Sequence, residues 1–179
     1  MQKIIKTIGV LVNIIIINTL LLNTAVAELP VPKGILVWTE KDAPSLVLKD
    51  LDGQVYDIRQ SKGKWVFMHF WASWCGPCRK ELPLIDAIVP LFKDSRMDIV
   101  LVNTSEDEDT VFSFLGDVAP ELTTLMDSDG KVTANWKPRG LPSTYLVSPD
   151  GKLAYVVLGG RAWNQPVYLK FLQGLMKTR

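Results

Sequence analysis

The chain has 179 residues, a formal net charge of +1, and 47% hydrophobic and 22% charged residues. These values are ordinary for a single globular domain that is large enough to bury a core. The basic residues form no stripe along the chain, so we expect no nucleic-acid partner.

The first 27 residues have the pattern of an export leader. Two lysines precede an apolar stretch, and Ala25-Val26-Ala27 has the small residues that a signal peptidase requires. Cleavage there would leave a mature chain that starts at Glu28. The alternative is an uncleaved membrane anchor, because residues 7–27 could almost cross a bilayer of about 30 Å as a helix. Either reading places the domain in the periplasm or elsewhere outside the cytoplasm, with membrane contact only if the leader stays attached.

The elements after the leader begin with an irregular lead-in over residues 28–42, because prolines interrupt and border this stretch. Residues 43–179 then form the domain. Residues 46–58 predict a β-hairpin with its turn at Asp52-Gly53. Residues 64–72 form an almost continuous apolar and aromatic run, which is typical of a central strand covered on both faces.

A helix is expected directly after this strand. Pro77 suits its first turn, and apolar residues recur at helical spacing as far as residue 92. Pro83 should kink this helix, because it removes a backbone hydrogen bond. Strands and helices then alternate: strands at 97–103 and 122–126, helices at 106–116 and 132–136, a hairpin at 143–147 and 153–158, and a closing helix at 165–177. This order predicts an α/β fold with a mixed central sheet and helices on both faces.

The only two cysteines, Cys75 and Cys78, are separated by Gly76 and Pro77. Exported cysteines usually form permanent disulfides, but a ring closed across two residues removes little chain entropy and stabilises a fold poorly. A zinc site would need about four ligands, and in addition to the two cysteines the chain has only one histidine, His69. The spacing therefore favours redox chemistry over a structural disulfide or a zinc site.

The two thiols are expected to differ in their roles. Cys75 stands just before the helix, where unpaired N–H groups and the helix dipole stabilise an anion. We therefore expect an exposed Cys75 whose thiol pKa lies below its usual value of about 8.5. Cys78 lies one turn inside the helix and is expected to be buried. Cys75 would act as the nucleophile, and Cys78 would resolve the mixed disulfide.

The sequence around the cysteines resembles a known family. Residues 70–83 read FWASWCGPCRKELP, and residues 140–151 read GLPSTYLVSPDG. With the hairpin, these segments resemble the thioredoxin superfamily and, more narrowly, its exported TlpA/ResA-type thiol–disulfide oxidoreductases. The resemblance runs from about residue 43 to the C-terminus. It implies a thioredoxin-like fold with an added N-terminal β-hairpin, and no metal or organic cofactor beyond a redox-active Cys75–Cys78 disulfide.

The resemblance also implies a substrate-binding surface. Leu141-Pro142 matches the position where the family holds a cis-proline beside the cysteines, and its loop would present backbone groups to an extended substrate segment. The alternative is an ordinary proline at the start of a strand. Trp74, with Gly76 and Pro77, would form an apolar patch on which a protein substrate docks.

Two further residues are candidates for moving a proton. Glu81 matches a family glutamate and shares a helix face with Cys78, so it could accept the proton of that thiol; the alternative is a glutamate on the helix surface. His69 is a departure, because thioredoxin has an aspartate at this position and many exported relatives have an asparagine. His69 could accept the same proton or could be a hydrogen-bonded core residue.

The resemblance implies a reductant of protein disulfides, because the reducing members carry Gly-Pro between their cysteines. Such a protein would be kept reduced by a membrane thiol transporter and would act on oxidised proteins such as apocytochrome c. A thiol peroxidase on the same fold is an alternative, although Ala72 stands where peroxidases of this fold carry a threonine. A redox-inert binding or chaperone module is another.

Overall fold

A computed structural model describes residues 29–177, so the predicted leader and its cleavage site lie outside the described residues. The domain is built on a six-stranded mixed sheet with the strand order β1-β8-β7-β4-β5-β6, and a separate two-stranded sheet pairs β2 with β3. None of the helices between residues 29 and 177 is long and apolar enough to span a bilayer.

The elements have the following bounds. The strands of the main sheet are β1 (Ile35–Asp42), β4 (Trp65–Trp71), β5 (Met97–Thr104), β6 (Leu125–Asp127), β7 (Ser143–Val147) and β8 (Lys152–Leu158). The hairpin consists of β2 (Val47–Lys49) and β3 (Val55–Asp57), followed by the short 3-10 helix η1 (Ile58–Ser61). The helices are α2 (Gly76–Asp86), α3 (Val89–Phe92), α4 (Glu108–Val118), α5 (Lys131–Trp136) and α6 (Pro166–Leu175).

Strand β4 is the centre of the sheet, as its apolar sequence predicts. All seven of its residues are buried. It pairs in parallel with β5 and antiparallel with β7, so its backbone groups are bonded on both sides. His69 is the one ionisable residue of this strand, and like its neighbours it is completely buried.

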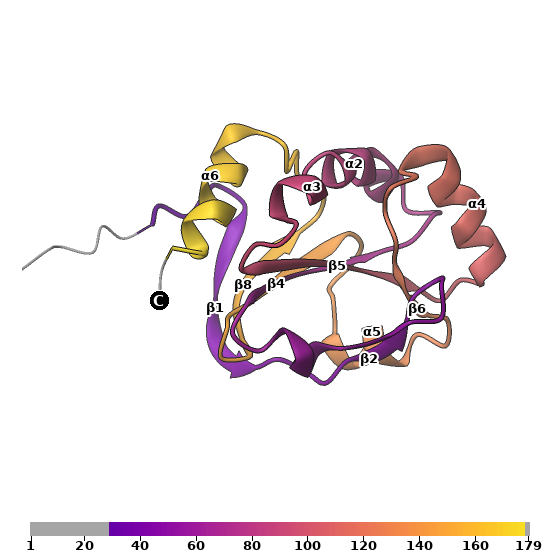
Figure 1. Ribbon diagram of the computed structural model, residues 1–179, viewed down its shortest axis with the longest axis horizontal. Helices are drawn as coiled ribbons and strands as arrows, with labels where there is room; N and C mark the ends of the chain where they lie inside the picture. The colour runs from indigo at the N-terminus through magenta and orange to yellow at the C-terminus, as the bar shows by residue number, and fades with distance from the viewer. Residues whose placement is uncertain (1–28, 178–179) are drawn as a thin grey trace, which may run out of the picture.

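Helices cover both faces of the sheet (Figure 1). One face packs against α2, α3, α4 and α6, and residues such as Leu82 and Leu172 belong to its core. The opposite face packs against α5 and the β2–β3 hairpin, with Leu46 and Trp136 in its core. The predicted fold class, including the added hairpin, is confirmed.

The expectation of an irregular segment over residues 28–42 was wrong for β1. This strand pairs antiparallel with β8, and Ile35 lies opposite Val157. The ladder to β8 supplies the backbone hydrogen bonds, and the prolines at 30 and 32 precede the strand without interrupting it. Because β1 is an edge strand, Leu36 and Val37 are largely exposed, and the clean apolar alternation of an inner strand is missing.

The helix predicted after the cysteines is divided in two. α2 ends at Asp86 and α3 begins at Val89, where Pro90 occupies the first turn. Pro83 is accommodated inside α2, and the division follows it by less than two turns. The part that carries the cysteines is thus a compact helix of 11 residues, on the sheet face that α3, α4 and α6 also cover (Figure 1).

Candidate functional site

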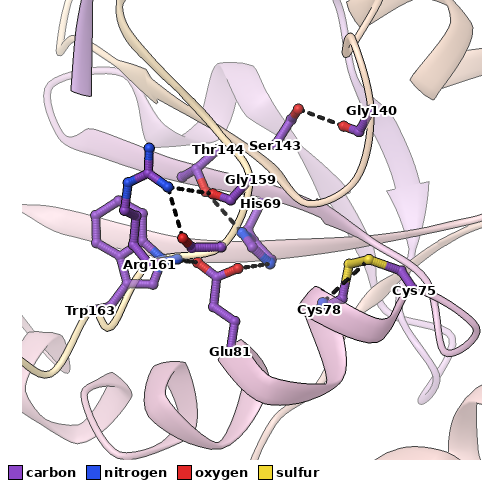
Figure 2. Close-up of polar contacts among 11 residues, drawn as sticks. His69, Cys75, Cys78, Glu81, Gly140, Ser143, Thr144, Gly159, Arg161 and Trp163 are labelled. Atoms are coloured by element: carbon purple, nitrogen blue, oxygen red, sulfur yellow. Dashed lines mark hydrogen bonds and ion pairs between the residues drawn. A yellow bond between two sulfur atoms is a disulfide. The ribbon is translucent and has the colours of Figure 1, made fainter. Parts of the chain in front are cut away.

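Cys75 and Cys78 form a disulfide at the N-terminus of α2 (Figure 2). Cys75 is the N-cap residue of this helix, and its Sγ accepts a hydrogen bond from the backbone N–H of Cys78 at 3.3 Å. An N-cap acceptor is favoured because the first N–H groups of a helix have no partner within it. The same N–H groups would stabilise a Cys75 thiolate once the disulfide is opened.

The expected exposure of Cys75 was wrong, although the order of burial is as expected. Cys75 is only 5% exposed and Cys78 is fully buried. Both side chains belong to the apolar core on the α2 side of the sheet, because Cys75 turns inward to bond Cys78. Trp74 is 68% exposed, which leaves a large apolar ring at the surface beside the disulfide.

The substrate loop predicted at Leu141-Pro142 lies at the same edge of the sheet as the disulfide. β4 ends and β7 begins at this edge, because Phe70 pairs with Ser143. The Leu141-Pro142 peptide bond is cis, which is the geometry that the resemblance implies. In the loop, the Ser143 hydroxyl donates to the carbonyl of Gly140 at 2.7 Å, as drawn in Figure 2.

A third loop at this edge contributes a residue that the sequence analysis missed. Glu106 follows β5, and its carboxylate accepts hydrogen bonds from the backbone N–H of Ser73 at 2.7 Å and from the Ser73 hydroxyl. Asn103 donates to the same carboxylate at 2.7 Å. Glu106 therefore fixes the loop that leads into Cys75. From the sequence, residue 106 could be placed only at the start of a predicted helix, because nothing in its spacing connects it with residue 73.

Glu81 is a buried glutamate, so the alternative of a surface residue is wrong. It is 2% exposed. Its Oε1 accepts hydrogen bonds from the backbone N–H of Arg161 at 3.0 Å and from the indole N–H of Trp163. Burial raises the pKa of the Glu81 carboxyl from 4.5 to about 7, although these donors and the Arg161 charge lower it. Such a carboxyl can gain and lose a proton near neutral pH.

The residues that hold Glu81 come from the segment between β8 and α6, which the sequence analysis did not connect with the site. Besides its backbone bond to Glu81, Arg161 donates from its guanidinium to the carbonyl of Gly34 at 3.0 Å. Trp163 is fully buried against Phe67 of β4. The hydrogen bonds from Arg161 and Trp163 to Glu81 tie α2 to the segment that precedes α6. Arg161 lies 80 residues after Glu81 in the chain, so no local sequence pattern could predict this contact.

His69 faces Glu81 from the central strand. Its Nδ1 lies 2.9 Å from the hydroxyl of Thr144 on β7, and its Nε2 lies 4.0 Å from Glu81 Oε2. Complete burial lowers the pKa of His69 from 6.5 to about 3, so the imidazole is neutral at physiological pH. The contact with Glu81 is therefore not an ion pair. The side chains are drawn together in Figure 2, where Glu81 and Cys78 project from the same helix.

The fold and the site together define a thioredoxin-like thiol–disulfide oxidoreductase. A mixed sheet carries a Cys-Gly-Pro-Cys disulfide at the start of a helix, with a cis-proline loop at the same sheet edge. The Redoxin family model matches residues 39–172, and the chain belongs to this family. Within it, the chain is of the ResA/TlpA type.

Similar proteins are named as oxidoreductases of the same class. The chain is 36% identical over 118 residues to the thiol-disulfide oxidoreductase ResA of Bacillus subtilis, with 66% of each chain covered. It is 30% identical over 131 residues to ResA of Bacillus thuringiensis subsp. konkukian, covering 73% of this chain and 76% of that protein.

Solved structures agree with this assignment. The thioredoxin domain of a thiol-disulfide oxidoreductase from Bacteroides vulgatus has a TM-score of 0.65 at 26% identity, covering 78% of this chain and 99% of that one. The exposed lipoprotein thioredoxin Etrx1 of Streptococcus pneumoniae has a TM-score of 0.63 at 26% identity, covering 73% and 99%.

Proposed function

We propose that this protein works outside the cytoplasm as a reductant of protein disulfides, and that its process is cytochrome c maturation. The observation that carries the proposal is the Cys75–Cys78 disulfide at the start of α2, with Gly-Pro between the cysteines as in the reducing members of the family. The leader pattern in residues 1–27 supports export. The name of the pneumococcal relative, an exposed lipoprotein, agrees with it.

The proposed reaction starts from the reduced protein. The Cys75 thiolate attacks a substrate disulfide, forms a mixed disulfide and releases one substrate thiolate. Cys78 then loses its proton to the Glu81 carboxylate, and its thiolate attacks the Cys75 sulfur. The mixed disulfide breaks, the second substrate thiolate leaves, and Cys75–Cys78 is oxidised by two electrons. A membrane thiol reductant returns these electrons, and no metal or organic cofactor is required.

The substrate is proposed to bind as an extended segment. The backbone at Leu141-Pro142 would pair with it as an added strand, while Trp74, Gly76 and Pro77 would contact its apolar side chains. The low exposure of Cys75 supports this geometry, because a narrow, unfolded segment reaches a sulfur that is 5% exposed more easily than a folded surface does.

The direction of the reaction is tested by its reduction potential. The purified protein is equilibrated in glutathione buffers, and its free thiols are labelled and counted by mass spectrometry. A reductant should have a potential near that of thioredoxin, about −270 mV, whereas a strong periplasmic oxidase lies near about −120 mV. A value at the oxidase end would contradict the proposed direction and leave thiol–disulfide exchange itself intact.

The substrates and the compartment are tested in cells. Cys78→Ser should stall mixed disulfides on Cys75, and the trapped partners should be extracytoplasmic proteins that include apocytochrome c. Cys75→Ser is the matched control and should trap none. Mass spectrometry of the protein from the producing cell should find an N-terminus at Glu28. A full-length protein recovered from the cytoplasm would refute the export part of the proposal.

A further inference from the structure

Two buried polar atoms face each other without a hydrogen bond. They are Nε2 of His69 and Oε2 of Glu81, which lie 4.0 Å apart, and neither has a hydrogen-bond partner among residues 29–177. An unpaired buried polar group is costly, so such atoms normally find a partner. The gap is about 1 Å longer than an N–H···O hydrogen bond, which a small side-chain motion can close.

The other polar atoms of both side chains are already bonded. His69 Nδ1 lies 2.9 Å from the Thr144 hydroxyl. Glu81 Oε1 accepts from the Arg161 backbone and from Trp163. These contacts fix the orientation of the imidazole and of the carboxyl group. Any proton that Glu81 gains is therefore placed on the oxygen that faces His69.

The groups around the pair determine what His69 can do. From α2 it faces Glu81, from β7 it faces Thr144, and the segment after β8 brings the Arg161 charge, which favours the Glu81 carboxylate. Burial keeps the imidazole neutral, whereas it brings the pKa of Glu81 to about 7. His69 therefore keeps one ring proton over the range in which Glu81 titrates, and only the position of this proton can change.

A neutral imidazole carries its proton on one nitrogen and accepts on the other. When Glu81 is ionised, a proton on Nε2 can be donated to its carboxylate, and the Thr144 hydroxyl donates to Nδ1. When Glu81 is protonated, its O–H donates to Nε2, and Nδ1–H donates to the Thr144 hydroxyl. A hydroxyl can donate or accept, so each arrangement gives a hydrogen-bond partner to both ring nitrogens of His69 and to Glu81 Oε2.

We propose that His69 changes tautomer whenever Glu81 gains or loses a proton, so that the buried carboxyl has a hydrogen-bond partner in both states. His69 is thus a positioning residue, which acts on Cys78 only through Glu81. The part that this tautomer change plays in thiol–disulfide exchange rests on the proposed function. After Cys78 has given its proton to Glu81, His69 carries its one ring proton on Nδ1 instead of Nε2, and the Thr144 hydroxyl accepts instead of donating; the net gain of the pair is the single proton that Cys78 lost. The changes reverse when Glu81 releases the proton to solvent.

His69 is the single histidine of the chain, so its signals can be assigned without ambiguity. The oxidised protein, labelled with ¹⁵N-histidine, is titrated by NMR from about pH 5 to about pH 9, a range that brackets the pKa of Glu81. The correlations of the ring nitrogens should report a proton on Nδ1 at low pH and on Nε2 at high pH. The same tautomer throughout, or an imidazolium in this range, would overturn the inference.

Glu81→Gln provides the matched variant. Its amide oxygen can still accept from Arg161 and Trp163, and its NH₂ group then donates to His69 Nε2. We expect the Nδ1–H tautomer at every pH, so the switch is lost. A switch that persists in Glu81→Gln would show that another group drives it. If this variant does not fold, the titration of the unsubstituted protein still decides the question.

A kinetic measurement separates this inference from the proposed function. The pH dependence of mixed-disulfide resolution should have its midpoint at the pH of the tautomer switch, and Glu81→Gln should lose both. If the tautomer switches and no protein disulfide is reduced, the proposed function fails and the switch stands. If disulfides are reduced and the tautomer is fixed, the inference fails and the function stands.

Discussion

Replacing Glu81 by glutamine should change how the stability of this protein depends on pH. The side chain is 2% exposed, and an amide can accept the two hydrogen bonds that its Oε1 now accepts. The substitution therefore removes the titrating proton with little change in shape or bonding. Any difference between the two proteins that varies with pH then reports the ionisation of one buried carboxyl group.

The magnitude follows from the pKa of Glu81, which burial raises from 4.5 to about 7. Between these values the folded protein holds a proton that the unfolded chain has lost. The stability contributed by this proton is fully present below the unfolded pKa of 4.5 and is lost as the pH rises through the folded pKa of about 7. At about 1.4 kcal/mol per unit of pKa shift, the loss is about 3 kcal/mol.

Urea unfolding, followed by tryptophan fluorescence with the disulfide closed, measures this loss. From about pH 4 to about pH 8, Glu81→Gln should gain about 3 kcal/mol of unfolding free energy relative to the unsubstituted protein. Glu108→Gln, at an exposed position in the first turn of α4, is the control and should show no comparable gain. A constant difference between the proteins, or a relative loss of stability in Glu81→Gln at high pH, would refute the reasoning.

Three further substitutions test other contacts of the site and the fold. Trp163→Phe removes a donor to the carboxylate, so the same pH series should place the pKa of Glu81 about one unit higher; an unchanged or lower value would mean that the indole does not bond it. Glu106→Ala frees the Ser73 loop and should cost about 2 kcal/mol in urea unfolding and slow mixed-disulfide formation, whereas equal rates would show that the loop needs no such support. Asp127→Ala leaves two backbone N–H groups of α5 without their acceptor and should cost about 2–4 kcal/mol, which a neutral result would contradict.

The parts of the fold that could be predicted from the sequence are those with a strong local pattern. The buried run of β4, the hairpin at Asp52-Gly53 and the helix that follows the cysteines each had one. β1 had none, because its hydrogen bonds come from β8, more than a hundred residues later, and it is half open to solvent. Long-range pairing of this kind overrides the local signal of prolines nearby.

The site shows the same division. The cysteine spacing and the motif around it located the disulfide, and the position of Pro142 indicated its cis bond. The burial of Cys75 and the partners of Glu81 could not be found in this way. Arg161 and Trp163 act on Glu81 from 80 and 82 residues away, and only the folded chain places them there.

The contact between His69 and Glu81 joins two layers of the domain, since one side chain comes from the central strand and the other from the helix that covers it. Strand β4 is bonded on both sides and cannot shift alone, whereas α2 rests on the sheet through side chains. The distance between His69 Nε2 and Glu81 Oε2 therefore depends on how closely the helix packs on the sheet. A substrate that lifts the start of α2 as it docks would change the proton affinity of the site before any sulfur bond is exchanged.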